Sequence, residues 1–262
     1  MEYKNVILQV EDHVGTLTLN RPDQRNAMTR ELGEDISEAV KAIKGNPDIW
    51  VLIITGAGKA FSAGGDLGMM KKSQELTPFE NRSFIRDFYP LFLSVLKLDV
   101  PTIAAINGAA IGAGLCFALA CDIRYIAEEA QIGVNFTRLG IHPGMGGTYF
   151  LPRIVGLEKA RELFFTGRLI NGREAKEIGL TSAVFPAAEL MDKTRELARE
   201  IAKSAPIAVK MVKKALQYSM ENSLEAMLEY ESYCQGITFV SQDFKEGVNS
   251  FVEKGPPKFI GR

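Results

Sequence analysis

Two loops of small residues carry most of the chemical information in this chain. The segments Phe61-Ser-Ala-Gly-Gly-Asp66 and Gly108-Ala-Ala-Ile-Gly-Ala-Gly-Leu-Cys116 each follow a short apolar run that is typical of a strand. Loops of this composition expose backbone N–H groups, and a pair of such loops can stabilise one developing oxyanion. The second loop leads into an apolar helix from about Ala113, whose first N–H groups lack partners and lie at the positive end of the helix dipole. The two loops therefore predict an oxyanion hole.

The spacing of the glycines excludes two other uses of such loops. The run that begins at Gly56 lacks the Gly-x4-Gly-Lys-Ser/Thr pattern of a phosphate-binding loop. Phe61 stands where a dinucleotide-binding loop would have its third glycine. For the first loop considered alone, an ordinary tight turn is the simple alternative.

Composition narrows the class of protein. The chain has 262 residues, of which 46% are hydrophobic and 24% charged, and its net charge is −1. Such a balance provides no general basic field for nucleic acid or a membrane surface. The three cysteines have no spacing typical of a metal site or a disulfide framework, so we expect buried free thiols. The first residues show no signal or transit pattern, and no apolar run approaches ~18 residues. We therefore expect a cytoplasmic protein with no metal, nucleic acid or membrane partner.

Hydrophobic periodicity predicts an α/β fold. Short apolar runs predict strands at 6–9, 16–19, 50–55, 102–106 and 122–127. Thr29 can cap a helix that reaches Lys44 and has Leu32, Ile36, Ala39, Val40 and Ile43 on one face. A further helix is predicted over 73–99. Residues 1–186 are interpreted as the core and residues 187–262 as a helical region, which packs either on a neighbouring subunit or on its own domain.

Six motifs together identify a family. They are Leu19-Asn-Arg-Pro22 with Arg25-Asn-Ala-Met28, the run from Ile54 to Leu67, Pro101-Thr-Ile-Ala-Ala-Ile-Asn-Gly108, Ala120-Cys-Asp-Ile123, Leu139-Gly-Ile-His-Pro-Gly-Met-Gly-Gly-Thr148, and the tail from Phe251 to Arg262. With these motifs the chain resembles the enoyl-CoA hydratase/isomerase (crotonase) superfamily over essentially its whole length.

The resemblance implies a fold, a substrate and a set of contacts. The fold is a crotonase-like spiral of ββα units with a C-terminal helical trimerisation region, in a homotrimer or hexamer. The substrate is an acyl-CoA thioester, handled without a metal or redox cofactor. The oxyanion donors become the N–H groups of Gly65 and Ala113. The CoA moiety is expected to contact Arg25, Ala27, Ala63, Asp66 and Leu67, and Lys258 and Phe259 to approach the CoA of a neighbouring subunit.

The chain departs from the family pattern at both catalytic glutamates. Cys116 occupies the first glutamate position and Phe136 the second. Hydration requires a base for water and an acid for the α-carbon, each typically worth 10²–10⁴-fold. Family isomerases keep the second carboxylate, and dienoyl isomerases use an aspartate where this chain has Gly144. The two loops therefore indicate the substrate class, whereas the missing glutamates leave the reaction open.

Several nearby residues are candidate replacements. His142 lies in the loop beside the second glutamate position, and histidine titrates near neutral pH. Asp87 or Tyr89 in the helix that borders the acyl pocket, and Thr137 with Arg138, are further candidates for contact with the acyl group. A partial resemblance to the polyketide-pathway decarboxylases of the superfamily comes from Asn135-Phe136 and Pro143-Gly-Met-Gly, but their catalytic lysine and histidine have no equivalents here.

Three hypotheses follow. The first is an enzyme that forms an enolate from an acyl-CoA thioester with a non-standard acid or base, or with none. Decarboxylation of a CoA- or carrier-bound acyl group is one reaction of this kind. The second is a non-catalytic acyl-CoA binding protein. The third is a hydratase whose acid or base comes from His142 or the helix bordering the pocket.

Overall fold

Two parallel-stranded sheets form the centre of the fold. The structure is a computed structural model that describes residues 3–262. The six-stranded sheet has the order β1-β2-β3-β5-β7-β9, and the three-stranded sheet has the order β4-β6-β8. Only the β1–β2 pair is antiparallel. The strands are β1 Val6–Glu11, β2 Val14–Leu19, β3 Val51–Gly56, β4 Ala60–Ser62, β5 Thr102–Ile106, β6 Ala109–Ile111, β7 Ile123–Ala127, β8 Ile132–Gly133 and β9 Ala183–Phe185.

The strands alternate between the two sheets along the chain. Each of the pairs β3–β4, β5–β6 and β7–β8 gives its first strand to the large sheet and its second to the small one. This alternation is the spiral of two-strand units that was expected. Strands β3 and β5 are buried along their whole length, in agreement with their continuous apolar sequences.

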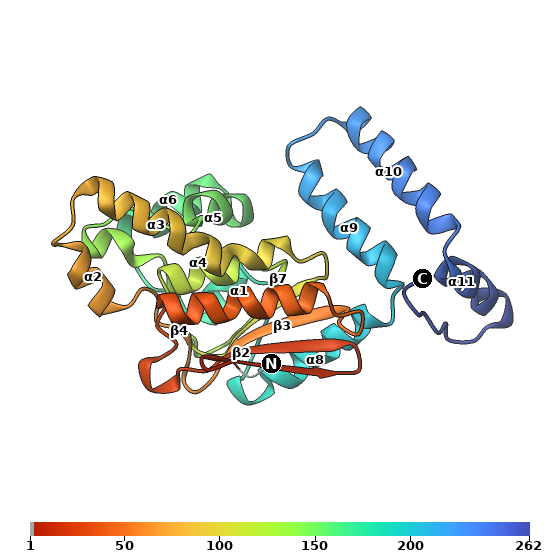
Figure 1. Ribbon diagram of the computed structural model, residues 1–262, viewed down its shortest axis with the longest axis horizontal. Coiled ribbons are helices and arrows are strands. Elements are labelled where there is room, and N and C mark those ends of the chain that lie inside the picture. Colours follow the sequence, from red (N-terminus) through yellow and green to blue (C-terminus); the bar gives the residue numbers. More distant parts are fainter. Residues whose placement is uncertain (1–2) are drawn as a thin grey trace.

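Helices cover the sheets on both sides (Figure 1). They are α1 Arg30–Lys44, α2 Leu67–Ser73, α3 Pro78–Phe92, α4 Ala113–Leu119, α5 Gly147–Val155, α6 Leu157–Thr166, α7 Gly172–Glu177, α8 Ala187–Ala202, α9 Pro206–Ser219, α10 Leu224–Phe239 and α11 Gln242–Glu253. Short 3-10 helices span Pro22–Gln24, Leu93–Lys97 and Asn135–Leu139. In α1, Thr29 is the N-cap and the predicted apolar face is buried, so both expectations are confirmed.

The helix predicted over 73–99 is confirmed only in part, because the chain is helical there from Pro78 to Lys97 and not from Ser73. Helix α2 ends at Ser73, and α3 begins at Pro78 behind the cap residue Thr77. The Thr77 hydroxyl accepts a hydrogen bond from the Glu80 N–H, and the Glu80 carboxylate accepts one from the Thr77 N–H at 2.8 Å. This reciprocal cap, with proline at the first helical position, starts a new helix. Helix α3 then tightens into the 3-10 turn at 93–97.

The C-terminal helices divide into two groups. Helix α8 begins at Ala187 and packs on β2, β3, β5 and β7. Helices α9, α10 and α11 extend away from the sheets, and the chain end lies beside α11, remote from α2 (Figure 1). Helix α8 lies after the predicted boundary at residue 187 but packs on the large sheet. The division of the chain at this residue therefore stays a prediction.

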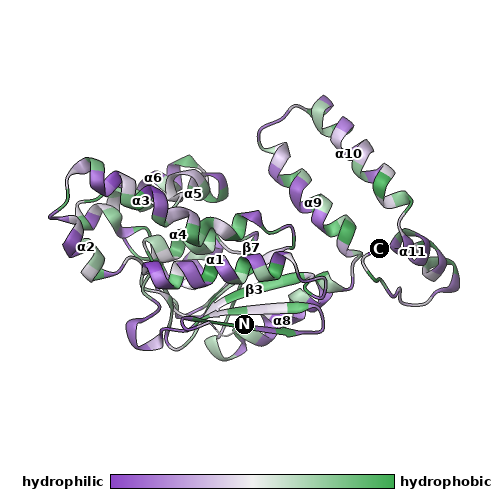
Figure 2. Ribbon diagram, in the orientation of Figure 1, coloured by the Kyte–Doolittle hydropathy of each residue, from purple (hydrophilic) through white to green (hydrophobic). Residues whose placement is uncertain are grey.

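Hydrophobic residues line the central strands but also run along the extended helices (Figure 2). In α9, Val212 is 56% and Leu216 65% exposed, and in α10 Leu224 is 70% exposed. These apolar side chains are therefore only partly covered by their own chain. No helix among the described residues combines the length and apolar character needed to cross a membrane.

Candidate active site

The first loop is held by a parallel backbone contact with the segment after the first 3-10 helix. The Ala63 N–H donates to the Arg25 carbonyl at 2.9 Å, and the Met28 N–H donates to the Gly64 carbonyl at 2.8 Å. These bonds place three predicted CoA-contacting residues, Arg25, Ala27 and Ala63, on two adjacent segments. The next residue of the loop, Gly65, is thereby fixed at the edge of the small sheet.

Asn26 anchors the same region from inside and was not singled out by the sequence motifs. Its side chain is fully buried, accepts a hydrogen bond from the Arg21 N–H at 2.8 Å, and donates to the carbonyls of Ala57 at 3.0 Å and Ala60 at 2.8 Å. Its backbone carbonyl accepts a hydrogen bond from the Ser62 hydroxyl at 2.8 Å. One asparagine thus ties the start of the loop to the segments before and after it.

The two glycine-containing loops are in direct backbone contact. Gly64 has a φ of +88°, and a Cβ on it would lie 2.4 Å from the Ile111 carbonyl oxygen and 3.6 Å from the Ala113 nitrogen. A Cβ on Gly114 would lie 2.6 Å from the Ser62 carbonyl oxygen. Side chains at either position would separate the loops, which explains the glycines.

The N–H groups of Gly65 and Ala113 come from these contacting segments. Neither donates a hydrogen bond to another protein group within residues 3–262. Ala113 is the first residue of α4, and its cap residue Gly112 has a φ of +52° and offers no side chain to accept a bond. First-turn N–H groups point outward along the helix dipole, so this edge presents backbone donors to a ligand oxygen.

Both glutamate positions lie beside the second loop. Cys116 follows Ala113 by one helical turn and is fully buried, and its Sγ lies 2.7 Å from where a Cβ on Gly147 would be. Phe136 is buried, and its ring lies 3.7 Å from where a Cβ on Gly112 would be. The structure therefore brings Cys116 and Phe136, where the family resemblance implies glutamates, to the candidate site, and Phe136 has no proton to transfer.

Burial removes Cys116 as a base or nucleophile near neutral pH. Desolvation raises the pKa of the Cys116 thiol from 9.0 to about 12, and a backbone hydrogen bond opposes this only in part. Burial also raises the pKa of Cys121 to about 12, with Asp122 contributing in the same direction. Because a thiol reacts as the thiolate, Cys116 is inert at neutral pH.

The two buried thiols predict a loss of stability in alkali. Between about pH 9 and 12 the unfolded chain has lost the two thiol protons that the folded chain retains, so the free energy of unfolding falls as pH rises. Urea unfolding at several pH values should show a shallower fall for Cys116→Ala with Cys121→Ala than for the parent chain. Cys234→Ala is the control, because Cys234 is not fully buried. An unchanged slope in the double variant would contradict the assignment.

The remaining candidates for acid–base chemistry are placed differently from one another. His142 is exposed, and its Nδ1 lies 2.7 Å from the Pro143 carbonyl oxygen. The Thr137 hydroxyl donates to the Phe164 carbonyl and Arg138 to the Thr166 carbonyl, so both are bonded to α6. Within residues 3–262 these side chains make their hydrogen bonds to other backbone carbonyls and none to Cys116, and their proposed roles stay predictions.

Helix α3 brings one candidate to the site and leaves another in solvent. The Asp87 side chain is 64% exposed and pairs loosely with Arg86 at 3.8 Å. Tyr89 is half-buried and packs against the core. Its hydroxyl oxygen lies 2.2 Å from where a Cβ on Gly144 would be, on the turn that also contacts Cys116.

The predicted CoA contacts fall at two ends of the chain. Asp66 caps α2 by accepting a hydrogen bond from the Met69 N–H at 2.9 Å, and Leu67 is 72% exposed beside it. Lys258 is exposed, and Phe259 packs over Gly247 of α11. Since α11 and the chain end lie far from α2 in Figure 1, the two groups do not meet within one chain.

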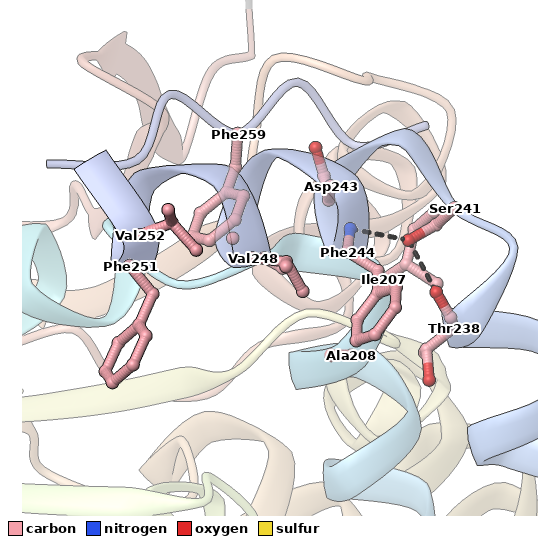
Figure 3. Close-up of a pocket in the computed structure, with 12 residues that line it drawn as sticks. Ile207, Ala208, Thr238, Ser241, Asp243, Phe244, Val248, Phe251, Val252 and Phe259 are labelled. Carbon is pink, nitrogen blue, oxygen red and sulfur yellow. Dashed lines mark hydrogen bonds between the residues drawn. The ribbon is translucent and has the colours of Figure 1, made fainter. Parts of the chain in front are cut away.

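Two cavities lie beside the C-terminal helices, away from the glycine loops. One, of about 500 Å³, is lined by apolar residues of α9 and α11 with Phe259 closing one side (Figure 3). The other, of about 650 Å³, lies between α9 and the core. Residues 3–262 contain no cluster of three side chains suited to a metal ion.

Comparison with known proteins agrees with the fold and the loops. The sequence model of the enoyl-CoA hydratase/isomerase family matches residues 9–262. The chain is 37% identical over 263 residues to a crotonyl-CoA hydratase of Syntrophomonas wolfei, covering 100% of both chains. It is 38% identical over 255 residues to a short-chain-enoyl-CoA hydratase of Clostridium acetobutylicum, covering 97% of each.

Solved structures give the same result. The structure superposes with a TM-score of 0.91 on an enoyl-CoA hydratase from Bacillus anthracis, which is 36% identical and is matched over 99% of this chain and 100% of that one. A second enoyl-CoA hydratase structure, from Geobacillus kaustophilus, gives a TM-score of 0.93 at 32% identity, covering 100% of this chain and 98% of that one. The α/β spiral, the paired glycine loops and these matches show that the chain belongs to the enoyl-CoA hydratase/isomerase family.

Proposed function

We propose that the protein acts on an acyl-CoA thioester by stabilising its enolate with the N–H groups of Gly65 and Ala113. The contact of Gly64 with Ile111 and Ala113 is the observation that carries this proposal. It sets the two loops against each other so that two N–H groups without protein acceptors emerge from neighbouring segments. Preorganised donors of this kind stabilise the negative charge that develops on a thioester oxygen.

The CoA moiety has a suitable surface on the same edge. We propose that it lies along Arg25, Ala27, Ala63, Asp66 and Leu67, whose segments the backbone bonds hold together. Lys258 and Phe259 would reach CoA only from another copy of the chain, because they lie remote from α2 (Figure 1). The exposed apolar side chains of α9 and α10 support a homotrimer or hexamer, which light scattering on the purified protein tests directly. No resident cofactor is invoked, and the expected compartment is the cytoplasm.

The side chains of Cys116 and Phe136 limit which reactions the proposed site can catalyse. Neither Cys116 nor Phe136 supplies a carboxylate that could activate water. Loss of CO₂ from a malonyl-type thioester generates the enolate without a base, so a decarboxylase-type reaction needs only the oxyanion hole and a proton for the α-carbon. The lack of glutamates at these two positions also supports the second candidate function, a protein that binds acyl-CoA without transforming it.

A panel of CoA esters in D₂O separates these possibilities. We expect turnover of methylmalonyl-CoA, with deuterium appearing at C2 of the product, because decarboxylation leaves an enolate that must take a proton from the site or solvent. Turnover of crotonyl-CoA would instead require a base for water, from His142 or from helix α3. Mass spectrometry measures the deuterium, and ultraviolet absorbance follows crotonyl-CoA hydration. Tight binding by calorimetry without turnover would support the non-catalytic alternative. Absence of both binding and turnover would contradict the proposed function.

A further inference from the structure

The turn at 144–147 receives side chains from two different helices. The turn is closed by a hydrogen bond from the Gly147 N–H to the Gly144 carbonyl at 2.9 Å. The Cys116 sulfur from α4 packs on Gly147, and the Tyr89 hydroxyl from α3 packs on Gly144. Both glycines are required by contact, since a Cβ would lie 2.7 Å from Sγ at one and 2.2 Å from the hydroxyl oxygen at the other. The phenol and the first glutamate position therefore share one turn.

Tyr89 is also connected to this turn electrostatically. Its pKa is raised, chiefly because burial disfavours the phenolate, while a hydrogen bond with the Met145 backbone opposes the shift and nearby Cys116 adds to it. The Met145 backbone has a φ of +53°, a conformation unusual for a residue with a side chain, and its side chain is buried. The turn therefore holds its backbone against the hydroxyl in a fixed conformation.

The position of Cys116 in α4 indicates how far the turn that contacts Tyr89 lies from the Ala113 N–H. Cys116 follows Ala113 by three residues, a rise of about 4.5 Å along the α4 axis and on the same face of the helix. The turn at 144–147, on which the Tyr89 hydroxyl packs, therefore contacts α4 about one helical turn from the Ala113 N–H. The carboxylates of α3 offer no rival, because Asp87 faces solvent and Glu80 is bonded to Thr77 at the helix start.

We propose that the Tyr89 hydroxyl is the catalytic acid that protonates the α-carbon of the enolate, in place of a carboxylate. This inference rests on the proposed function and names the proton donor for it. In the step, the Tyr89 O–H bond breaks and the enolate electron pair forms the new C–H bond. The negative charge passes from the thioester oxygen to the phenolate oxygen, and the phenolate then takes a proton from solvent water. A phenol that remains protonated in a buried site is suited to donate to an enolate and poorly suited to activate water.

Removal of the hydroxyl alone tests this assignment. Tyr89→Phe keeps the ring packing, so KM for methylmalonyl-CoA should stay within about threefold while kcat falls by about 10²–10⁴-fold, the usual range for a general acid. In D₂O the parent protein should place deuterium on one face of C2, and Tyr89→Phe should give a mixture of both stereoisomers in its residual product. Tyr125→Phe is the matched control, because Tyr125 of β7 is also half-buried but packs on Phe185 of β9.

A second variant moves the hydroxyl without deleting it. Gly144→Ala places a methyl group where the Tyr89 oxygen lies, so it should reproduce the loss in kcat. In the Tyr89→Phe background the same change should add little, because the nearest ring atom is then 3.0 Å from the new Cβ. Such non-additivity is expected when two changes act through one contact.

The outcomes separate this inference from the function on which it rests. If the parent protein turns over no member of the panel, the proposed function fails and the inference fails with it. If the parent protein is active and Tyr89→Phe keeps its rate and its single stereoisomer, the assignment of Tyr89 is overturned while the oxyanion hole stands.

Discussion

Gly64→Ala is expected to reduce kcat for a CoA thioester by about 10²–10³-fold, the effect of losing one oxyanion donor. Its Cβ would meet the Ile111 carbonyl oxygen at 2.4 Å, a contact with backbone that no rotamer change can relieve. One loop must therefore move away from the other. Because Gly65 follows in the first loop and Ala113 in the second, the two N–H groups would no longer point at the same oxygen.

The control for Gly64→Ala separates backbone strain from loop separation. Gly179 has a similar φ of +74°, but no atom lies within 4 Å of the Cβ that Gly179→Ala would add. It should lower stability by about 1 kcal/mol through strain alone and leave kcat within about twofold. Steady-state kinetics on the CoA ester panel and urea unfolding measure the two effects. A Gly64→Ala variant with more than a third of the parent activity would contradict the role given to the loop contact.

Asn26→Ala is expected to lower the free energy of unfolding by about 3–5 kcal/mol. The change removes one acceptor and two donors and leaves the Arg21 N–H and the Ala57 and Ala60 carbonyls without these partners. Each unpaired buried group costs about 1–3 kcal/mol, with partial compensation as water enters. Asparagine also tolerates the observed φ of +53° better than alanine does.

Asn222→Ala is the matched control for this loss of stability. Asn222 is exposed and donates one hydrogen bond to the Tyr218 carbonyl at 2.8 Å, so its removal should cost less than about 1 kcal/mol. Denaturant unfolding compares the two variants. If Asn26→Ala lost no more stability than Asn222→Ala, Asn26 would not be the anchor of the first loop.

The sequence predicted the parts of the fold that depend on local pattern. Continuous apolar runs gave the buried strands β3 and β5, and the spacing around Thr29 gave α1 with its cap. The predicted helix started at Ser73 instead of Pro78, although the Thr77-Pro-Phe-Glu80 cap was present in the sequence as the start signal of α3. In that region a long amphipathic pattern was given more weight than a start signal.

The sequence predicted the two loops of the site but only some of the side chains around them. Gly-rich composition after a strand is a local feature, so the position of Gly65 and Ala113 could be inferred. The burial of Asn26 depends on three segments that meet only in the folded chain, and no spacing in the sequence indicates it. Gly144 became informative only when the structure placed Tyr89 against it.

A crystal structure with bound butyryl-CoA tests the central claim most directly. The account predicts the thioester carbonyl oxygen about 2.7–3.1 Å from the nitrogens of both Gly65 and Ala113, the range for oxyanion donors. It also predicts the C2 atom on the side of Tyr89. A thioester carbonyl that faced away from both nitrogens, with the CoA moiety bound elsewhere, would contradict the assignment of the two loops as an oxyanion hole.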